Sequence, residues 1–140
     1  MKSFVEQRIL ALDIGTKRIG LAIWIPDAKL SRSLPVLERK VLQKDLQKIK
    51  TLVEQEKIEA LVVGMPYALS GAETDSTRNA KFWMQTLQEN FVIPVYEQDE
   101  SMSTQEAESI LKASSSSHRK QKKDSLAAAL ILEEFIRAHS

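Results

Sequence analysis

The feature that most constrains the fold is the order of the apolar segments along the chain. Residues 9–14 and 19–25 are apolar runs, and the sequence Gly-Thr-Lys-Arg at 15–18 separates them. A short glycine-bearing connection between two such runs is typical of a β-hairpin, so we expect two antiparallel strands. Residues 34–39 predict a third, short strand of the same meander, and Pro35 places it at an edge or a bulge of the sheet.

After the meander, helical and strand patterns alternate. Apolar residues at helical spacing predict one stripe of an amphipathic helix, formed by Leu42, Leu46, Ile49 and Val53. The apolar run 60–63, closed by Gly64, is typical of a buried parallel strand. A second helix is expected to be capped by Ser76 or Thr77 and to bury a stripe formed by Ala80, Trp83, Met84 and Leu87. Residues 92–96 predict the next strand.

The last part of the chain carries two more helical patterns. The sequence Ser-Thr-Gln-Glu at 103–106 fits a capping box, and an apolar helical face follows it. The serine-rich and basic stretch 114–123 interrupts this pattern, and we expect it to form a mobile loop. Residues 125–137, rich in alanine and leucine, predict the final helix.

This order predicts an α/β fold, in which a three-stranded antiparallel meander is extended by parallel strands into a mixed sheet flanked by helices. At 140 residues the chain fits one domain spanning 1–140, and its 43% hydrophobic content is enough for a buried core. Charged residues interrupt every apolar run before membrane-spanning length, so no membrane partner is expected. Residues 1–8 lack the apolar stretch of a signal peptide, which favours a cytoplasmic location.

Composition excludes some chemistry and leaves other chemistry open. The chain has no cysteine, which excludes a disulfide scaffold, a thiolate zinc site and a cysteine nucleophile. The net charge of +1 says little about partners, but local basic clusters attract a polyanion. One cluster is the pair Lys17 and Arg18. The other follows the serines at 114–117 and comprises His118, Arg119, Lys120, Lys122 and Lys123.

Four carboxylates lie where strands or helices are expected to end. Asp13 interrupts the first strand, and Asp99 and Glu100 follow the strand at 92–96. Asp124 lies where the basic stretch meets the last helix. Ligand sites of open α/β sheets gather at strand ends, and converging carboxylates favour a hard cation such as Mg²⁺ or Mn²⁺. Two such ions about 3.5–4 Å apart can promote phosphodiester hydrolysis.

Taken singly, these acids also have simpler interpretations. Asp99 fits a solvated or capping acid. Asp124 fits a favourable residue at the N-terminus of the last helix, where the helix dipole stabilises a negative charge. Asp13 is the strongest ligand candidate, because it lies within an apolar strand, where an ionised group is costly without a partner.

Four motifs, in this order along the chain, are similar to a known family. Residues 12–22 read Leu-Asp-Ile-Gly-Thr-Lys-Arg-Ile-Gly-Leu-Ala, and residues 62–66 read Val-Val-Gly-Met-Pro. Residues 99–108 contain Asp-Glu, Ser-Thr and Glu-Ala-Glu, and residues 124–128 read Asp-Ser-Leu-Ala-Ala. This set resembles the YqgF family, the Holliday-junction-resolvase-like proteins of bacteria, over nearly the whole chain.

The resemblance implies an RNase H-like fold and a metal-dependent nuclease that matures the 5′ end of pre-16S ribosomal RNA. It implies that the acidic triad is Asp13, Glu100 and Asp124, which selects Glu100 over Asp99 as the metal ligand. Neighbours on an extended segment point opposite ways, so only one of that pair is expected to face Asp13. Nucleic acid is expected to contact Thr16, Lys17 and Arg18, together with Arg119, Lys120, Lys122 and Lys123.

Two departures from the family pattern bear on substrate binding. Ser101 stands where the family commonly has an arginine. If that arginine binds phosphate, then Lys17, Arg18 or the basic run must substitute for it. Residues 67–75 also differ from the asparagine-bearing loop usual in the family.

Other functions stay open at this point. A Holliday junction resolvase acting on four-way DNA needs two active sites facing two strands and hence a homodimer, whereas an RNA nuclease can act as a monomer. The Asp-x-Gly-Thr sequence at 13–16 also resembles the phosphate motif of sugar kinases and actin-like ATPases, which need two such domains. A catalytically silent nucleic-acid-binding module is a further alternative, and the three carboxylates argue against it.

Overall fold

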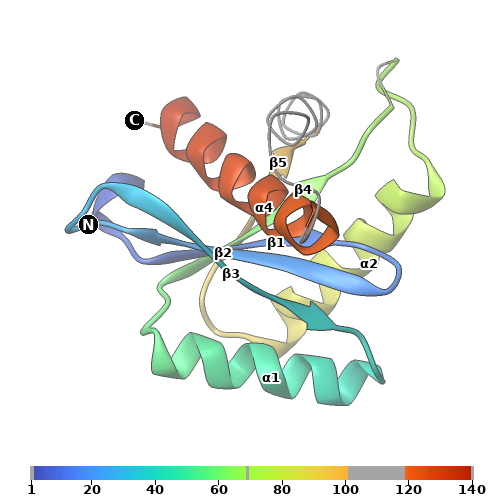
Figure 1. The fold of residues 1–140 in the computed structure, drawn as a ribbon, viewed down its shortest axis with the longest axis horizontal. Coiled ribbons are helices and arrows are strands. Elements are labelled where there is room, and N and C mark those ends of the chain that lie inside the picture. Colours follow the sequence, from blue (N-terminus) through green and yellow to red (C-terminus); the bar gives the residue numbers. More distant parts are fainter. Residues whose placement is uncertain (1, 69, 101–118, 140) are drawn as a thin grey trace.

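The fold is built on one mixed sheet of five strands. The computed structural model describes residues 2–68, 70–100 and 119–139, with the backbone alone for 119–125. The strand order is β3-β2-β1-β4-β5 (Figure 1). Strands β1 to β3 are antiparallel, and β4 and β5 continue the sheet in parallel with β1. The predicted meander extended by parallel strands is therefore confirmed. The strands are β1 (Ile9–Ile14), β2 (Arg18–Ile25), β3 (Leu30–Glu38), β4 (Ala60–Met65) and β5 (Val95–Asp99).

Helices cover both faces of this sheet. One face packs against α1 (Leu42–Gln55) and α2 (Asp75–Asn90), and the other packs against α4 (Arg119–Ala138) (Figure 1). A short 3₁₀ helix, η1 (Phe4–Glu6), precedes β1. Among the described helices, none is both long enough and apolar enough to cross a membrane.

The alternation of side chains along β1 explains the two cores. Leu10, Leu12 and Ile14 are buried against α1 and α2, whereas Ile9 and Ala11 are buried against α4. Successive side chains of a strand point to opposite faces, so both halves of this apolar run are covered. The next odd-numbered residue is Asp13, which places a carboxylate on the α4 face of the sheet.

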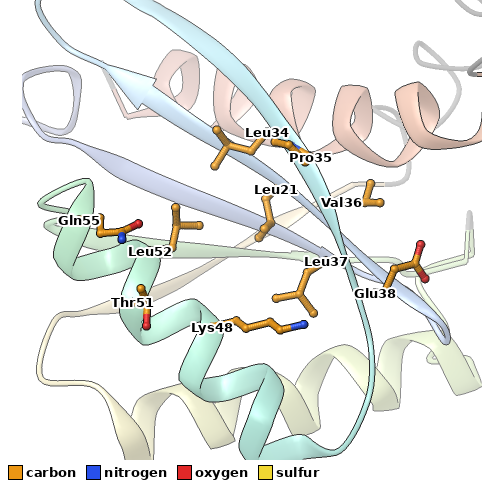
Figure 2. Close-up of a pocket in the computed structure, with 10 residues that line it drawn as sticks. All are labelled: Leu21, Leu34, Pro35, Val36, Leu37, Glu38, Lys48, Thr51, Leu52 and Gln55. Atoms are coloured by element: carbon orange, nitrogen blue, oxygen red, sulfur yellow. The ribbon is translucent and has the colours of Figure 1, made fainter.

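The edge strand β3 is longer than its sequence pattern predicts. It begins at Leu30 rather than at residue 34, because the polar residues 31–33 pair with β2 at the edge of the sheet. Pro35 lies in this edge strand, as predicted. A groove of about 460 Å³ runs between β3 and α1 and is lined by Leu34, Leu37, Leu52 and neighbouring residues (Figure 2).

Two other strand boundaries differ from the predicted ones. Gly64 does not close β4 but lies inside it, paired with Gln98 of β5, and the strand continues to Met65. Strand β5 begins at Val95 rather than at residue 92. Val92 is fully exposed, and contact with the sheet begins where the Leu61 amide donates to the Pro94 carbonyl at 2.9 Å.

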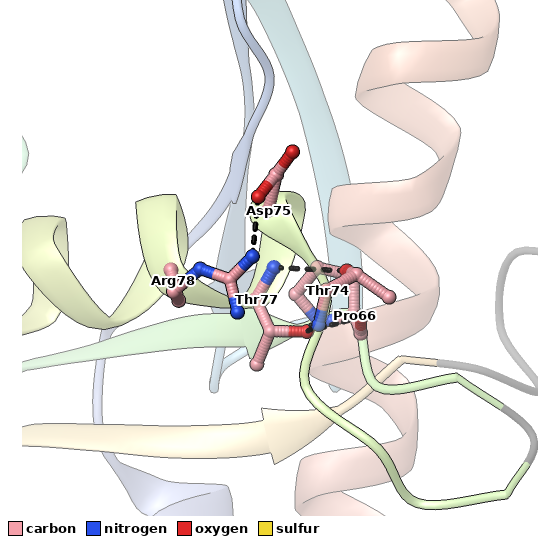
Figure 3. Close-up of polar contacts among 5 residues, drawn as sticks. All are labelled: Pro66, Thr74, Asp75, Thr77 and Arg78. Carbon is pink, nitrogen blue, oxygen red and sulfur yellow. Dashed lines mark hydrogen bonds and ion pairs between the residues drawn. The ribbon is translucent and has the colours of Figure 1, made fainter.

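The cap of α2 is Thr74, not Ser76 or Thr77. Its hydroxyl accepts a hydrogen bond from the Thr77 amide, and the Thr77 hydroxyl in turn accepts from the Thr74 amide (Figure 3). Thr77 is buried, and its hydroxyl donates to the Pro66 carbonyl at 2.8 Å. This capping box therefore ties the start of α2 to the segment that leaves β4.

The predicted loop at 114–123 is wrong for residues 119–123, which are already part of α4. Arginine, lysine and glutamine are good helix formers, and no glycine or proline interrupts the run, so the helix extends through it. The helix predicted after the capping box at 103–106 lies outside the described residues.

Candidate active site

Asp13 lies at the end of the central strand, between two glycines. It pairs with Gly20 of β2, and the pairing of β1 with β4 reaches the Leu12–Val63 pair, one residue before Asp13 and Gly64. Neither glycine carries a side chain. The residues next to Asp13 on the two neighbouring strands therefore leave room for other groups on the α4 face of the sheet.

Glu100 reaches the same place from the end of β5. Its amide donates to the Met65 carbonyl at 3.2 Å, which continues the pairing with β4 by one residue. Its carboxyl group lies directly over Gly64. A Cβ added to Gly64 would collide with Glu100 Oε2 and with the Ile131 side chain of α4. Gly64 thus makes the room that the Glu100 carboxyl group occupies between the sheet and the helix.

Asp13 and Glu100 interact although 86 positions separate them in the sequence. Glu100 is buried, with 5% of its surface exposed. Burial, the negative charge of Asp13, a hydrogen bond between the two carboxyl groups and the charge of Asp99 together raise the pKa of Glu100 to about 9. Two acids held this close keep a proton between them unless a cation compensates the charge. Hard oxygen donors crowded in this way suit a divalent ion such as Mg²⁺.

Asp99 and Glu100 differ in burial, as the alternation of an extended segment predicts. The Asp99 residue is exposed and ends β5, whereas Glu100 is buried against Gly64. The structure thus brings Glu100 rather than Asp99 to Asp13.

Asp124 belongs to α4, and its side chain lies outside the described part of the structure. In an α-helix, residues 124, 128, 131 and 135 follow one stripe, and the last three are buried against the sheet. Phe135 packs on Phe4 and Tyr96, and Ile131 lies over Gly64, so the stripe advances toward the Asp13 end as it approaches residue 124. Among the described side chains, no three acidic or histidine residues form a group that could hold a metal ion.

The basic residues predicted near the site fall in two places. The β1–β2 turn is closed by the Gly15 amide, which donates to the Arg18 carbonyl at 2.9 Å, and a Cβ on Gly15 would collide with that oxygen. Thr16 and Lys17 are exposed at this turn, and Arg18 begins β2. The others are carried by the first turns of α4, which are Arg119, Lys120, Lys122 and Lys123.

Arg39 is a residue that the sequence interpretation missed. Its side chain donates to the Gly15 carbonyl at 2.5 Å, its amide donates to the Lys17 carbonyl at 2.9 Å, and its guanidinium lies 5.5 Å from the centre of the buried Trp83 ring. Arg39 therefore fastens the turn that follows Asp13 to the α2 side of the fold. The only available signal was a basic residue at the end of a predicted strand, and such residues are common.

These features define the class of protein. A mixed five-stranded sheet with helices on both faces, carrying one acid at the end of its central strand and another just after β5, is an RNase H-like α/β fold of the resolvase type. RuvC of Thermus thermophilus, solved alone and in complex with a Holliday junction substrate, has this fold. It matches with a TM-score of 0.55 at 16% identity, covering 94% of this chain and 96% of RuvC.

Residues 7–138 match the RuvX family, described as Holliday junction resolvase, and the chain belongs to that family. A relative from Koribacter versatilis, named "Putative pre-16S rRNA nuclease", is 40% identical over 136 residues, which are 96% of this chain and 89% of the relative. A relative of the same name from Maridesulfovibrio salexigens is 35% identical over 131 residues, or 92% and 97% of the two chains. The family resemblance drawn from the sequence is therefore confirmed.

Proposed function

We propose that this protein is a metal-dependent nuclease that hydrolyses phosphodiester bonds in structured RNA and processes the 5′ end of pre-16S ribosomal RNA. The observation that carries the proposal is the acidic pair where strands β1 and β5 end. In this pair Asp13 and Glu100 share a hydrogen bond, and the pKa of Glu100 rises to about 9. The names of the two relatives above support the RNA substrate. A cytoplasmic location is part of the same proposal.

In this proposal Asp13, Glu100 and Asp124 hold one or two divalent ions, Mg²⁺ or Mn²⁺. When bound, such an ion lowers the pKa of a water molecule and offsets negative charge on the phosphate. The three acids supply only oxygen donors, which match these ions. Helical spacing from Ala128 and Ile131, which are buried against the sheet, would put position 124 on the same stripe of α4, and this supports Asp124 as the third acid.

The basic residues of the two segments beside the site would bind the substrate. Thr16 and Lys17 are exposed on the turn three and four residues after Asp13, with Arg18 next to them, and their donors would contact phosphate oxygens. The run Arg119, Lys120, Lys122 and Lys123 on α4 would raise the local concentration of a polyanion. Their positive charge would offset the repulsion between the substrate and the carboxylates.

A second candidate is cleavage of a four-way DNA junction. The description of the RuvX family and the junction complex of the RuvC neighbour favour it. That reaction requires a homodimer with two sites, whereas trimming of an RNA end is open to a monomer.

The test is incubation of the purified protein with precursor ribosomal RNA and, separately, with a four-way DNA junction, each with and without Mg²⁺ or Mn²⁺. We expect metal-dependent cleavage of the RNA near the mature 5′ end and none of the junction. Cleavage of the junction alone would establish the resolvase alternative. Cleavage of neither substrate under any metal condition would overturn the proposal in favour of a silent binding module.

A further inference from the structure

A row of lysines leads away from the candidate active site along the face of the molecule that α1 covers. It begins with Lys17 on the turn after Asp13 and continues with Lys40, Lys44 and Lys48, and we call these four residues the α1 lysine strip. All four are exposed. The Arg39 amide donates to the Lys17 carbonyl at 2.9 Å, which joins the turn directly to the residue before Lys40. Figure 1 shows the β1–β2 turn and the start of α1 at the same end of the molecule.

These lysines differ from several paired cations elsewhere in the described structure, where Lys29, Lys50 and Lys57 also form no ion pair. Lys2 and Arg8 form ion pairs with Glu59 and Glu56 at 3.1 and 3.0 Å, and Lys81 pairs with Glu73 at 3.0 Å. Within the described residues, no carboxylate forms an ion pair with any lysine of the strip. The positive charge of the strip is therefore available to a ligand, whereas the paired cations are already neutralised.

Two acids lie near the strip without pairing with it. Asp45 is buried and accepts a hydrogen bond from the Lys40 amide at 2.9 Å, so its carboxylate serves the start of α1. Glu38 is exposed and lines the groove between β3 and α1, toward which Lys48 extends (Figure 2). These groups reduce the positive charge of the strip but do not cover it.

The placement of the lysines works against the stability of α1. Lys40 and Lys44 lie at the N-terminus of the helix, where the helix dipole is positive and a cation is unfavourable. Lys44 and Lys48 are four residues apart on one helix, so their like charges repel each other. A local arrangement that costs stability and gains no pairing is typical of a functional surface. The positive end of α1 adds to the potential of the strip.

We infer that the α1 lysine strip binds the phosphate backbone of the nucleic acid on one side of the cleaved bond. The inference rests on the proposed function and extends it. The basic run of α4 lies on the opposite face of the sheet, so the two basic segments flank the edge that carries Asp13 and Glu100. A strand that crosses this edge would meet α4 on one side of the site and α1 on the other.

The test compares two triple variants that each remove three positive charges. The strip variant is Lys40→Gln, Lys44→Gln and Lys48→Gln. The control variant is Lys2→Gln, Arg32→Gln and Lys81→Gln, which removes paired cations, Arg32 being paired with Glu56 at 3.5 Å. Binding is measured without divalent metal, using single-stranded RNAs of about 24 and about 6 nucleotides, since single-strand sites cover roughly 4–16 nucleotides. Thermal melting checks the fold, and the strip variant should melt no lower than the wild type because repulsion in α1 is relieved.

We expect the strip variant to bind the longer RNA about tenfold more weakly. The slope of log affinity against log salt should become shallower by about two, because three lost phosphate contacts each account for about 0.7 of that slope in a single strand. The affinity advantage of the longer RNA over the shorter one should shrink in the strip variant and persist in the control variant. Equal weakening in both variants would overturn the inference, as would an unchanged salt slope. So would equally strong competition by a polyglutamate peptide. Failure of the wild type to bind either RNA would overturn the proposed function itself.

Discussion

The two ends of strands β1 and β4 differ in how their charged side chains are arranged. Where β1 and β4 begin, Arg8 donates to the Glu56 carbonyl and pairs with its carboxylate, and Phe4, Tyr96 and Phe135 pack edge to face or tilted. Where the strands end, two carboxyl groups face each other and exposed lysines have no ion pair within the described residues. At the first end Arg8 is paired with an acid of the chain, whereas at the second end no described carboxylate forms an ion pair with the α1 lysine strip.

This difference shows which end folding requires and which end function requires. Opposite charges that pair and rings that interlock stabilise the fold whether or not a ligand is present. Like charges brought together cost stability, and they are retained only where something else compensates them. Substitutions at the two ends should therefore separate into effects on stability and effects on activity.

The largest effect is expected from the acidic pair. Asp13→Asn or Glu100→Gln keeps the size of the side chain but removes a negative ligand, so the cleavage rate should fall by several orders of magnitude while the protein stays folded. Asp99→Asn is the matched control, because Asp99 is exposed where Glu100 is buried beside Asp13, and it should cost far less. Cleavage rates and melting temperatures of all three variants make the comparison. Equal losses in the Asp99 and Glu100 variants would show that the three-carboxylate assignment is wrong.

At the opposite end, Phe135→Ala should act on stability alone. Phe135 is 1% exposed and contacts the Phe4 and Tyr96 rings, so its removal leaves a cavity that costs about 3–5 kcal/mol of unfolding free energy. Urea unfolding measures this loss, and the cleavage rate per folded molecule at low temperature should change little. A large drop in that rate would mean that the aromatic end positions α4 for catalysis and that the two ends are not separable.

The acidic pair should also make stability depend on pH. Glu100 has a pKa of about 9 in the folded protein, above its ordinary value of 4.5. The folded state therefore holds a proton that the unfolded state has released, and stability falls as the pH rises from about 5 to about 9. The melting temperature of metal-free wild-type protein should drop over this range by several degrees more than that of Glu100→Gln. Parallel curves for the two proteins would contradict a raised pKa.

Most of the fold could be predicted from the sequence, because the periods of the apolar residues are local. The boundaries that differ are set by partners elsewhere in the chain. Residues 31–33 are polar yet extend β3, since β2 supplies their pairing, and Val92 is apolar yet lies outside β5. Helix α4 begins at Arg119, before the predicted residue 125. The prediction was wrong because it interpreted a basic run of good helix formers as a loop.

The site could be predicted only in part. The strand-end rule marked Asp13, Asp99 and Glu100, but only the register of β1, β4 and β5 shows that Glu100 lies over Gly64 beside Asp13. Arg39 was missed because its role depends on contacts with Gly15 and Trp83, which are distant in sequence. The assignment of Asp124 as a ligand stays a prediction.

The smallest effect is expected from the paired charges. Arg8 and Glu56 are both about one-third exposed, and exposed ion pairs contribute about 0–1 kcal/mol because water screens them and two side chains must be held in place. Arg8→Gln should therefore lower the free energy of unfolding by no more than about 1 kcal/mol, with part of that loss due to the bond from Arg8 Nε to the Glu56 carbonyl. A double-mutant cycle with Glu56→Gln in urea isolates the charge pair, and RNA affinity should stay unchanged because this cation is already neutralised. If Arg8→Gln weakens RNA binding as much as a substitution in the α1 lysine strip, then ion pairing does not determine which cations bind RNA. That result would contradict the proposed difference between the two ends of the strands.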